Sequence, residues 1–214
     1  GDVYKRQAFG ILISKLRSGG NLMYPSEPFS NPKRNMIDSS VKADKFGWYD
    51  YYAGYSPTFV QDVLNYLNLR QDSIILDPWN GSGTTTQVAE DSGFHAIGYD
   101  VNPVMVIVAK ARSLDPGVKA SLRSLTADIL NKASSYQSPS NLQVEPLEIW
   151  LSTESAAVAR NIERAIQQLL VEGYRYHVLY QEQNLDLMST IAAFFYTALF
   201  RTIHQLLLPF WCSN

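Results

Sequence analysis

The sequence contains very little cysteine, because Cys212 is the single cysteine among 214 residues. This excludes a disulfide framework and a cysteine-rich zinc site. The three histidines, His95, His177 and His204, lack the spacing of metal ligands, so we expect no metal site. The cysteine usage predicts a reducing, cytoplasmic setting.

The chain also lacks a strong excess of charge and a long apolar run. Its 18 basic and 20 acidic residues leave a net charge of −2, so no global basic field draws it to nucleic acid. Leu187–Phe200 is shorter than the about 20 residues that a membrane span needs and contains hydroxyl residues. We therefore expect a buried helix there and no membrane association. Residues 1–20 carry no signal-peptide cleavage pattern.

The first residues have an unusual sequence. Asp2–Gln7 is similar to the translated end of a transposon used to build sequencing libraries. We therefore expect residues 1–7 to be a sequencing artefact and the chain to be a fragment that is incomplete at both ends.

Residues 56–112 carry regular patterns that alternate between helix and strand. Ser56-Pro57 is typical of a helix start, and the helix after it has one apolar face made of Phe59, Val60, Val63, Leu64 and Leu67. A strand of the fully buried kind is expected at 73–76, and a helix at 84–92 with Gly93 after its end. Another strand is expected at 96–100 and another helix at 102–112. This alternation predicts a parallel sheet.

The whole chain divides into three expected regions. Residues 1–45 are irregular, residues 46–133 form the α/β region that binds a cofactor, and residues 134–214 are helical and truncated. Helices are expected at 118–133, after the cap Ser152, and at 185–208. The middle helix has an apolar stripe and ends at Gly173; the stripe is Val158, Ile162, Ile166 and Leu169.

The segment Ile74–Thr86 carries the chemistry. An apolar strand ends in Asp77, a turn with Gly81 and Gly83 follows, and hydroxyl residues open the next helix. Ligands bind at strand ends of open α/β sheets, and helix N-termini present free N–H groups. We interpret Asp77 as a carboxylate beside a cofactor; a carboxylate that caps the next helix is the alternative.

The composition of the loop distinguishes between cofactors. It has no lysine, which a triphosphate-binding P-loop requires, and Thr86 stands where a dinucleotide fingerprint has its third glycine. An acid directly before the loop would repel a pyrophosphate but suits S-adenosylmethionine, which carries a sulfonium and an ammonium group. Asp100 lies 23 positions after Asp77, where an acid typically binds ribose hydroxyls. Capping the next helix is its alternative or additional role.

These motifs resemble those of the DNA methyltransferases that modify adenine N6 or cytosine N4. Asp77–Thr85 is similar to that family's cofactor loop, with Trp79 in place of its usual phenylalanine, and Asp100 matches its ribose acid. Tyr52–Pro57 loosely resembles the motif that contacts the methionine end of the cofactor; core packing is the alternative for its aromatic residues. The resemblance implies these cofactor-binding residues: Tyr55, Asp77, Pro78, Trp79, Gly81, Ser82, Gly83, Thr84, Thr85, Asp100, Val101 and Asn102.

The family's catalytic motif is missing. That motif is Asp/Asn/Ser-Pro-Pro followed by an aromatic residue, and the chain contains no Pro-Pro. In one subgroup the motif follows the cofactor loop in the chain, which would put it beyond Asn214. We therefore name no catalytic residue and expect this fragment to be inactive, with DNA contacts supplied mostly by parts outside it.

The expected fold is α/β, a partial Rossmann-like methyltransferase sheet with a helical C-terminal part. The expected function is S-adenosylmethionine-dependent methyl transfer to an exocyclic amino group of DNA. An RNA or protein methyltransferase, a nicotinamide-dependent oxidoreductase and a non-catalytic binding module are the alternatives.

Overall fold

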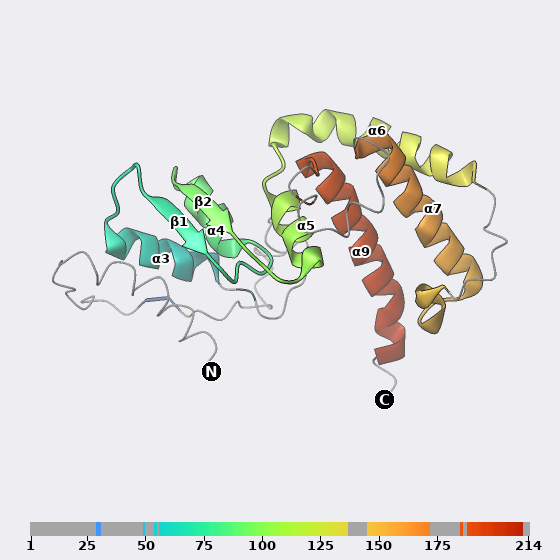
Figure 1. The fold of residues 1–214 in the computed structure, drawn as a ribbon, viewed down its shortest axis with the longest axis horizontal. Coiled ribbons are helices and arrows are strands. Elements are labelled where there is room, and N and C mark those ends of the chain that lie inside the picture. Colours follow the sequence, from blue (N-terminus) through green and yellow to red (C-terminus); the bar gives the residue numbers. More distant parts are fainter. Residues whose placement is uncertain are drawn as a thin grey trace. The chain divides into compact units, whose positions relative to one another are not determined.

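The chain forms two compact units, residues 1–112 and 113–214. The computed structural model describes residues 29–30, 49, 54, 56–136, 145–171, 185 and 188–211. The first unit is a mixture of helices and strands and the second is helical (Figure 1).

The first unit begins with helix α3, Pro57–Leu67. Ser56 is extended and Pro57 occupies the first turn, where its missing N–H costs nothing. All five residues of the predicted apolar face are buried, so this prediction is confirmed. The helix ends at Asn68, whose left-handed φ of 43° lets its N–H bond to the carbonyl of Asn65.

Two parallel strands form the sheet, β1 (Ile74–Asp77) and β2 (His95–Gly98), in the register Ile74 to His95 and Asp77 to Gly98. Helix α4, Thr84–Asp91, connects them, and α5, Pro103–Arg112, follows β2. The predicted strand–helix alternation and parallel pairing are confirmed. Gly93 follows α4 with a φ of 82°, as the prediction of a glycine after the helix end requires.

The core of the first unit lies between α3, α4 and one face of the sheet. Ile75 and Val88 pack with the apolar face of α3, and Phe29 meets Phe59 and Tyr66 edge-on, with ring centroids 6.2 and 5.5 Å apart. Each fully buried aliphatic side chain contributes about 1.5–3 kcal/mol.

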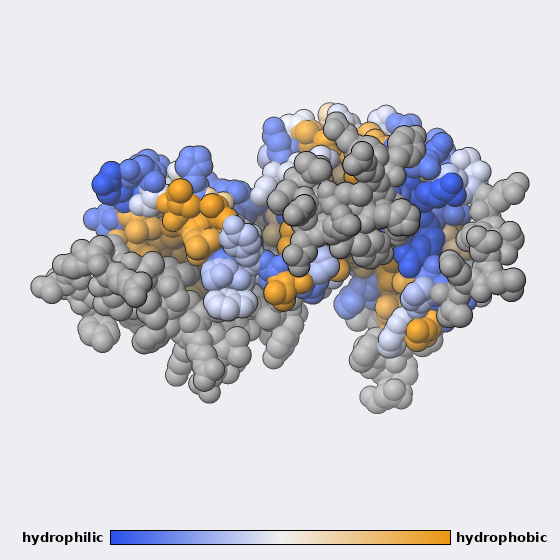
Figure 2. Space-filling view, in the orientation of Figure 1, coloured by the Kyte–Doolittle hydropathy of each residue, from blue (hydrophilic) through white to orange (hydrophobic). Residues whose placement is uncertain are grey.

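The prediction that the first strand is fully buried was wrong. Ile75 and Asp77 are buried, but Ile74 and Leu76 are 63% and 54% exposed. Strand side chains alternate between faces, and α3 and α4 contact only the face that carries Ile75. Ile97, paired with Leu76, is exposed on the same open face, and Figure 2 shows hydrophobic residues gathered over β1 and β2.

The second unit contains α6 (Lys119–Ser134), α7 (Thr153–Leu170) and α9 (Thr190–Trp211), with α7 packed against both of the others. Two short 3-10 helices, Pro116–Val118 and Pro146–Ile149, precede α6 and α7. The sequence-based division after residue 133 differs from the structural one after Arg112, because α6 packs on α7.

Helix α7 begins as predicted, since Ser152 accepts a hydrogen bond from the Ser155 N–H at 3.3 Å. Its predicted apolar stripe was partly wrong, because Val158 and Leu169 are 57% and 44% exposed. The buried face of α7 uses small side chains instead, and it comprises Ala156, Ala159, Ala165, Ile166 and Gln167. Gly173, predicted to end the helix, lies outside the described residues.

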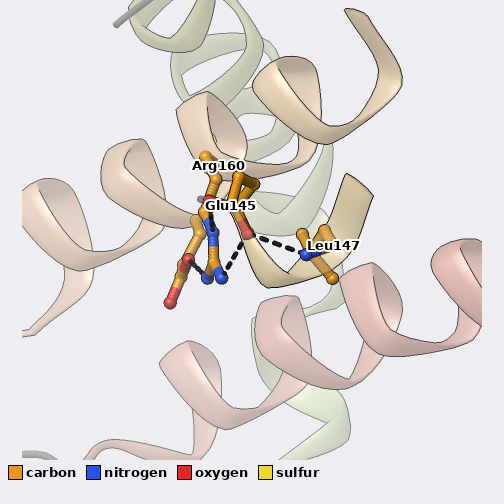
Figure 3. A network of polar contacts seen from close by, with 4 residues as sticks. Glu145, Leu147 and Arg160 are labelled. Carbon is orange, nitrogen blue, oxygen red and sulfur yellow. Dashed lines mark hydrogen bonds and ion pairs between the residues drawn. The ribbon is translucent and has the colours of Figure 1, made fainter. Parts of the chain in front are cut away.

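A charged network joins the residue before the second 3-10 helix to α7. Arg160 binds both carboxylate oxygens of Glu145 at 2.8 and 2.9 Å, and Glu163 at 2.6 Å (Figure 3). Glu145 also accepts from the Leu147 N–H at 3.0 Å. The Arg160 guanidinium lowers the pKa of Glu145, and the two glutamates raise the pKa of Arg160.

Across the described ranges, no helix combines the length and the apolar character needed to cross a membrane. The apolar segment that the sequence assigns to a buried helix forms part of α9. Its residues Ala192, Ala193 and Phe195 are buried.

Candidate functional site

The carboxyl ends of β1 and β2 meet at one edge of the sheet, and the polar residues of interest lie there. Asp77 is the last residue of β1 and is 5% exposed. Its carboxylate accepts from the Trp79 N–H at 3.0 Å, and its carbonyl accepts from the Tyr99 N–H at 2.9 Å. Helix α4 begins after Gly83 without a side-chain cap, so the structure does not support the alternative that Asp77 caps it.

The turn after β1 depends on its two glycines. Gly81 and Gly83 have φ of 54° and 85°, a region that side chains with a Cβ enter at a cost. Gly83 also lies directly against α5, because a Cβ on it would stand 2.7 Å from Cβ of Ala109. The loop therefore passes close to α5, where a larger residue does not fit.

Asn80 joins the loop to β2, a role that the sequence analysis missed. Its N–H donates to the carbonyl of Tyr99 at 2.9 Å, and its carbonyl accepts from the Gly83 N–H at 2.9 Å. Its side chain accepts from the Thr86 hydroxyl at 3.2 Å and occupies the space that a Cβ on Gly98 would fill. The glycine of β2 is thus explained by Asn80, a pairing that no local pattern indicates.

Asp100 holds the loop from the other strand. Its carboxylate accepts from the Gly81 N–H at 2.7 Å and from the Asn102 N–H at 2.8 Å. At the start of α5 the side chain of Asn102 accepts from the Val104 N–H at 3.0 Å, so Asn102 supplies this cap rather than Asp100. A carboxylate has about four acceptor positions, so Asp100 keeps capacity for two further donors.

The N-terminus of α4 carries buried polar groups that have no partner among the described residues. Thr84 and Thr85 are 2% and 1% exposed, and their hydroxyl oxygens form no hydrogen bond among the described residues. A buried polar atom without a partner is costly. Together with the N–H groups of an uncapped helix start, these hydroxyls suit a polar or anionic ligand group.

Apolar side chains surround this edge of the sheet. Trp79, Tyr99 and Val101 are 63%, 62% and 97% exposed, and Pro78 is exposed beside Trp79. They provide flat and aliphatic surfaces next to the two carboxylates, which suit an aromatic ring system.

The predicted site residues therefore fall into three groups. Asp77, the glycine loop and Asp100 lie together and are linked by hydrogen bonds; Ser82 is buried inside the loop. Val101 and Asn102 follow Asp100 as exposed residues at the same edge. Tyr55, predicted from the loosely matching motif, lies outside the described residues.

A second residue missed by the sequence analysis is Arg112, the last residue of α5. It is 4% exposed and donates to the carbonyl and the hydroxyl of Ser82 at 2.5 and 3.0 Å. The sequence signal for its burial was its position four residues after Val108, which places it on the apolar face of α5.

A cavity of about 550 Å³, lined by Gln61, Asn65, Phe94 and neighbours, lies at the amino ends of the strands, away from Asp77 and Asp100. Within the described residues, no three His, Cys, Asp or Glu side chains group in a way that could hold a metal ion.

A parallel strand–helix–strand unit with a glycine loop and an acid at each strand end belongs to the class of α/β folds that bind ligands at the carboxyl edge. Residues 38–111 match the model of the N6/N4 methyltransferase family, described as DNA methylase. This segment, about a third of the chain's length, is therefore similar to the N6/N4 DNA methylase family.

Two curated relatives agree with this match. The type II methyltransferase M.BsoBI of Geobacillus stearothermophilus is 36% identical over 112 residues, which cover 51% of this chain and 22% of that protein. The type II methyltransferase M.MjaII of Methanocaldococcus jannaschii is 28% identical over 85 residues, 38% of this chain and 16% of that protein. The matched part thus spans about a fifth of the relatives' length. No solved structure matches.

Proposed function

We propose that the first unit binds S-adenosylmethionine and that the whole protein transfers a methyl group to an exocyclic amino group of DNA, at adenine N6 or cytosine N4. The observation that carries this proposal is the position of the family segment. Residues 38–111 contain β1, the glycine loop, α4, β2 and nearly all of α5, so they include both carboxylates and the loop between them.

The residues at this edge fit the parts of the cofactor. Bound S-adenosylmethionine supplies a methyl group carried on a sulfonium. In this proposal the carboxylate of Asp77 attracts the positively charged groups at the methionine end of the cofactor. The start of α4, with Thr84 and Thr85, binds the cofactor's own carboxylate. Asp100 uses its remaining acceptor positions for the ribose hydroxyls. Trp79 and Val101 contact the adenine, which their exposure permits.

The same proposal includes the doubly wound, Rossmann-like sheet of which β1 and β2 would be a part. The open face of β1 and β2, with Ile74, Leu76 and Ile97 exposed, is what remains when one helix layer of a doubly wound sheet is absent. We place the missing layer, the further strands and the catalytic Pro-Pro motif in the rest of the protein. The fragment alone then binds cofactor without methylating DNA.

The family description, DNA methylase, supports DNA as substrate, and the names of the two relatives, both type II methyltransferases, support a restriction-modification setting. A nicotinamide cofactor is the main competitor. Thr86 stands where its fingerprint needs a glycine, and the Thr86 hydroxyl is used within the loop, donating to Asn80 and to the Gly83 carbonyl at 3.2 Å each.

Calorimetry with the 214-residue chain distinguishes these cofactors. S-adenosylhomocysteine should bind and NAD should not; binding of NAD without a response to S-adenosylhomocysteine would defeat the proposal. A double-mutant cycle then tests Asp100. Asp100→Ala is combined with the dideoxyribose analogue of S-adenosylhomocysteine, and each change alone should weaken binding about 10- to 100-fold, as the loss of charged hydrogen bonds does.

The coupling between the two changes distinguishes a ribose contact from a structural role. If Asp100 binds the ribose, the combined loss is much smaller than the product of the two single losses. If Asp100 only holds Gly81 and Asn102, the losses multiply and the ribose assignment fails. Methylation by a longer protein that contains the Pro-Pro motif tests the transfer itself.

A further inference from the structure

Arg112 is a buried charge at the end of α5. It ends α5, whose buried residues also include Met105, Val108 and Ala111, and it is 4% exposed. A guanidinium does not lose its proton in a protein, so burying it requires acceptors that offset the lost hydration. Two acceptors among the described residues lie on Ser82, its carbonyl at 2.5 Å and its hydroxyl at 3.0 Å.

The Ser82 carbonyl belongs to the peptide unit that joins the two halves of the glycine loop. That planar unit contains the Ser82 carbonyl and the Gly83 N–H. Arg112 binds the carbonyl, and the Asn80 carbonyl binds the N–H at 2.9 Å. The peptide plane is therefore held at both of its ends, one of them by a charge from another element.

The Ser82–Gly83 peptide plane needs a restraint from outside the loop because glycines stand on either side of Ser82. Gly81 and Gly83 have positive φ on either side of Ser82, and glycine has the widest choice of backbone conformations. Asp100 restrains the first glycine through its N–H. Arg112 restrains the unit that leads directly into α4 and hence the direction of the N–H groups at the helix start.

We infer that Arg112 is a positioning residue for the cofactor loop: it fixes the Ser82–Gly83 peptide so that the loop and the start of α4 are presented to the cofactor in the binding conformation. The inference rests on the proposed cofactor site. It concerns a residue outside the segment 38–111 that matches the family model.

The test compares affinity and stability in the 214-residue chain. Arg112→Met removes the charge and the donors, and Arg112→Lys keeps the charge but loses the planar fork. Arg70→Met is the matched control, since Arg70 is exposed and pairs with Asp72 at 2.7 Å. Each variant is titrated with S-adenosylhomocysteine at a temperature where circular dichroism shows it fully folded.

Arg112→Met should raise the Kd about tenfold or more, as loss of a charged hydrogen bond in the loop does. Arg70→Met should stay within about twofold, and millimolar methylguanidinium should recover part of the affinity of Arg112→Met. Hydrogen exchange should show loss of protection at the Gly83 amide that exceeds the loss in α3. If Arg112→Met does not fold, Arg112→Lys is judged by the same criteria.

Two failures are distinct. An unchanged Kd in folded Arg112 variants, with a lower melting temperature, would make Arg112 a packing residue and overturn this inference alone. Absence of binding in the unsubstituted chain would overturn the proposed cofactor site and this inference with it.

Discussion

Gly83 provides the sharpest test of the loop geometry. Its φ of 85° disfavours any residue with a Cβ, and a Cβ there would meet Ala109 Cβ at 2.7 Å and its Cα at 3.0 Å. The left-handed conformation costs about 1–2 kcal/mol, and overpacking of a close contact costs about 1–3 kcal/mol more. Gly83→Ala should therefore destabilise the first unit by about 2–5 kcal/mol.

Gly93→Ala is the matched control for this substitution. Gly93 has nearly the same φ, 82°, but its added Cβ would meet only the Nε2 atom of Gln71, at 3.1 Å. That atom ends a flexible, exposed side chain, which can move. Gly93→Ala should cost only the conformational part, about 1–2 kcal/mol, so the difference between the two variants measures the contact with Ala109.

The assay is equilibrium urea unfolding, with hydrogen exchange to report the first unit separately from the second. A second substitution, Ala109→Gly, should cost about 1 kcal/mol by itself because glycine weakens a helix. Combined with Gly83→Ala it should restore part of the loss, since one of the two colliding carbons is gone. Equal destabilisation by Gly83→Ala and Gly93→Ala, or strict additivity with Ala109→Gly, would refute the close approach of the loop to α5.

Two further predictions concern the charged network and the open sheet face. Because Arg160 lowers the pKa of Glu145, the stabilisation from this pair is complete above the ordinary glutamate pKa of about 4.3 and is lost as the pH falls through the lowered value. Glu145→Gln should cost about 1 kcal/mol at pH 7 and progressively less in acid, as urea midpoints between pH 7 and 3 would reveal; a constant difference would contradict the ion pair. Replacing Leu76 and Ile97 by threonine should change stability by at most about 0.5 kcal/mol each, because both are exposed. Sedimentation should show less self-association, and a large loss of stability would mean that this face is covered.

The features predicted correctly from the sequence are those that local chemistry determines. The buried face of α3 follows from helical spacing, its start from Ser56-Pro57, and the end of α4 from a glycine that tolerates a positive φ at Gly93. The two acids at the strand ends were found because a strand that ends in Asp77 and a parallel neighbour that leads to Asp100 must bring both to one edge.

The features that were missed depend on neighbours distant in sequence. Whether Leu76 is buried depends on a helix layer over its face, and an apolar strand sequence carries no information about that layer. The exposure of Val158 follows because small alanines of α7 form its buried face. Arg112 and Asn80 act through partners in the loop and in β2, which no spacing rule links to them.

The ordered state of the loop has a consequence for the proposed cofactor site. Three groups of the chain itself hold the loop backbone: Asp100 at the Gly81 N–H, Asn80 at the Gly83 N–H and Arg112 at the Ser82 carbonyl. Ordering a residue costs about 1–2 kcal/mol of backbone entropy, and a loop that is already held has met this cost on folding. Binding energy is then available for contacts rather than for ordering. The buried hydroxyls of Thr84 and Thr85, still without partners among the described residues, are the groups that gain most when a polar ligand reaches the start of α4.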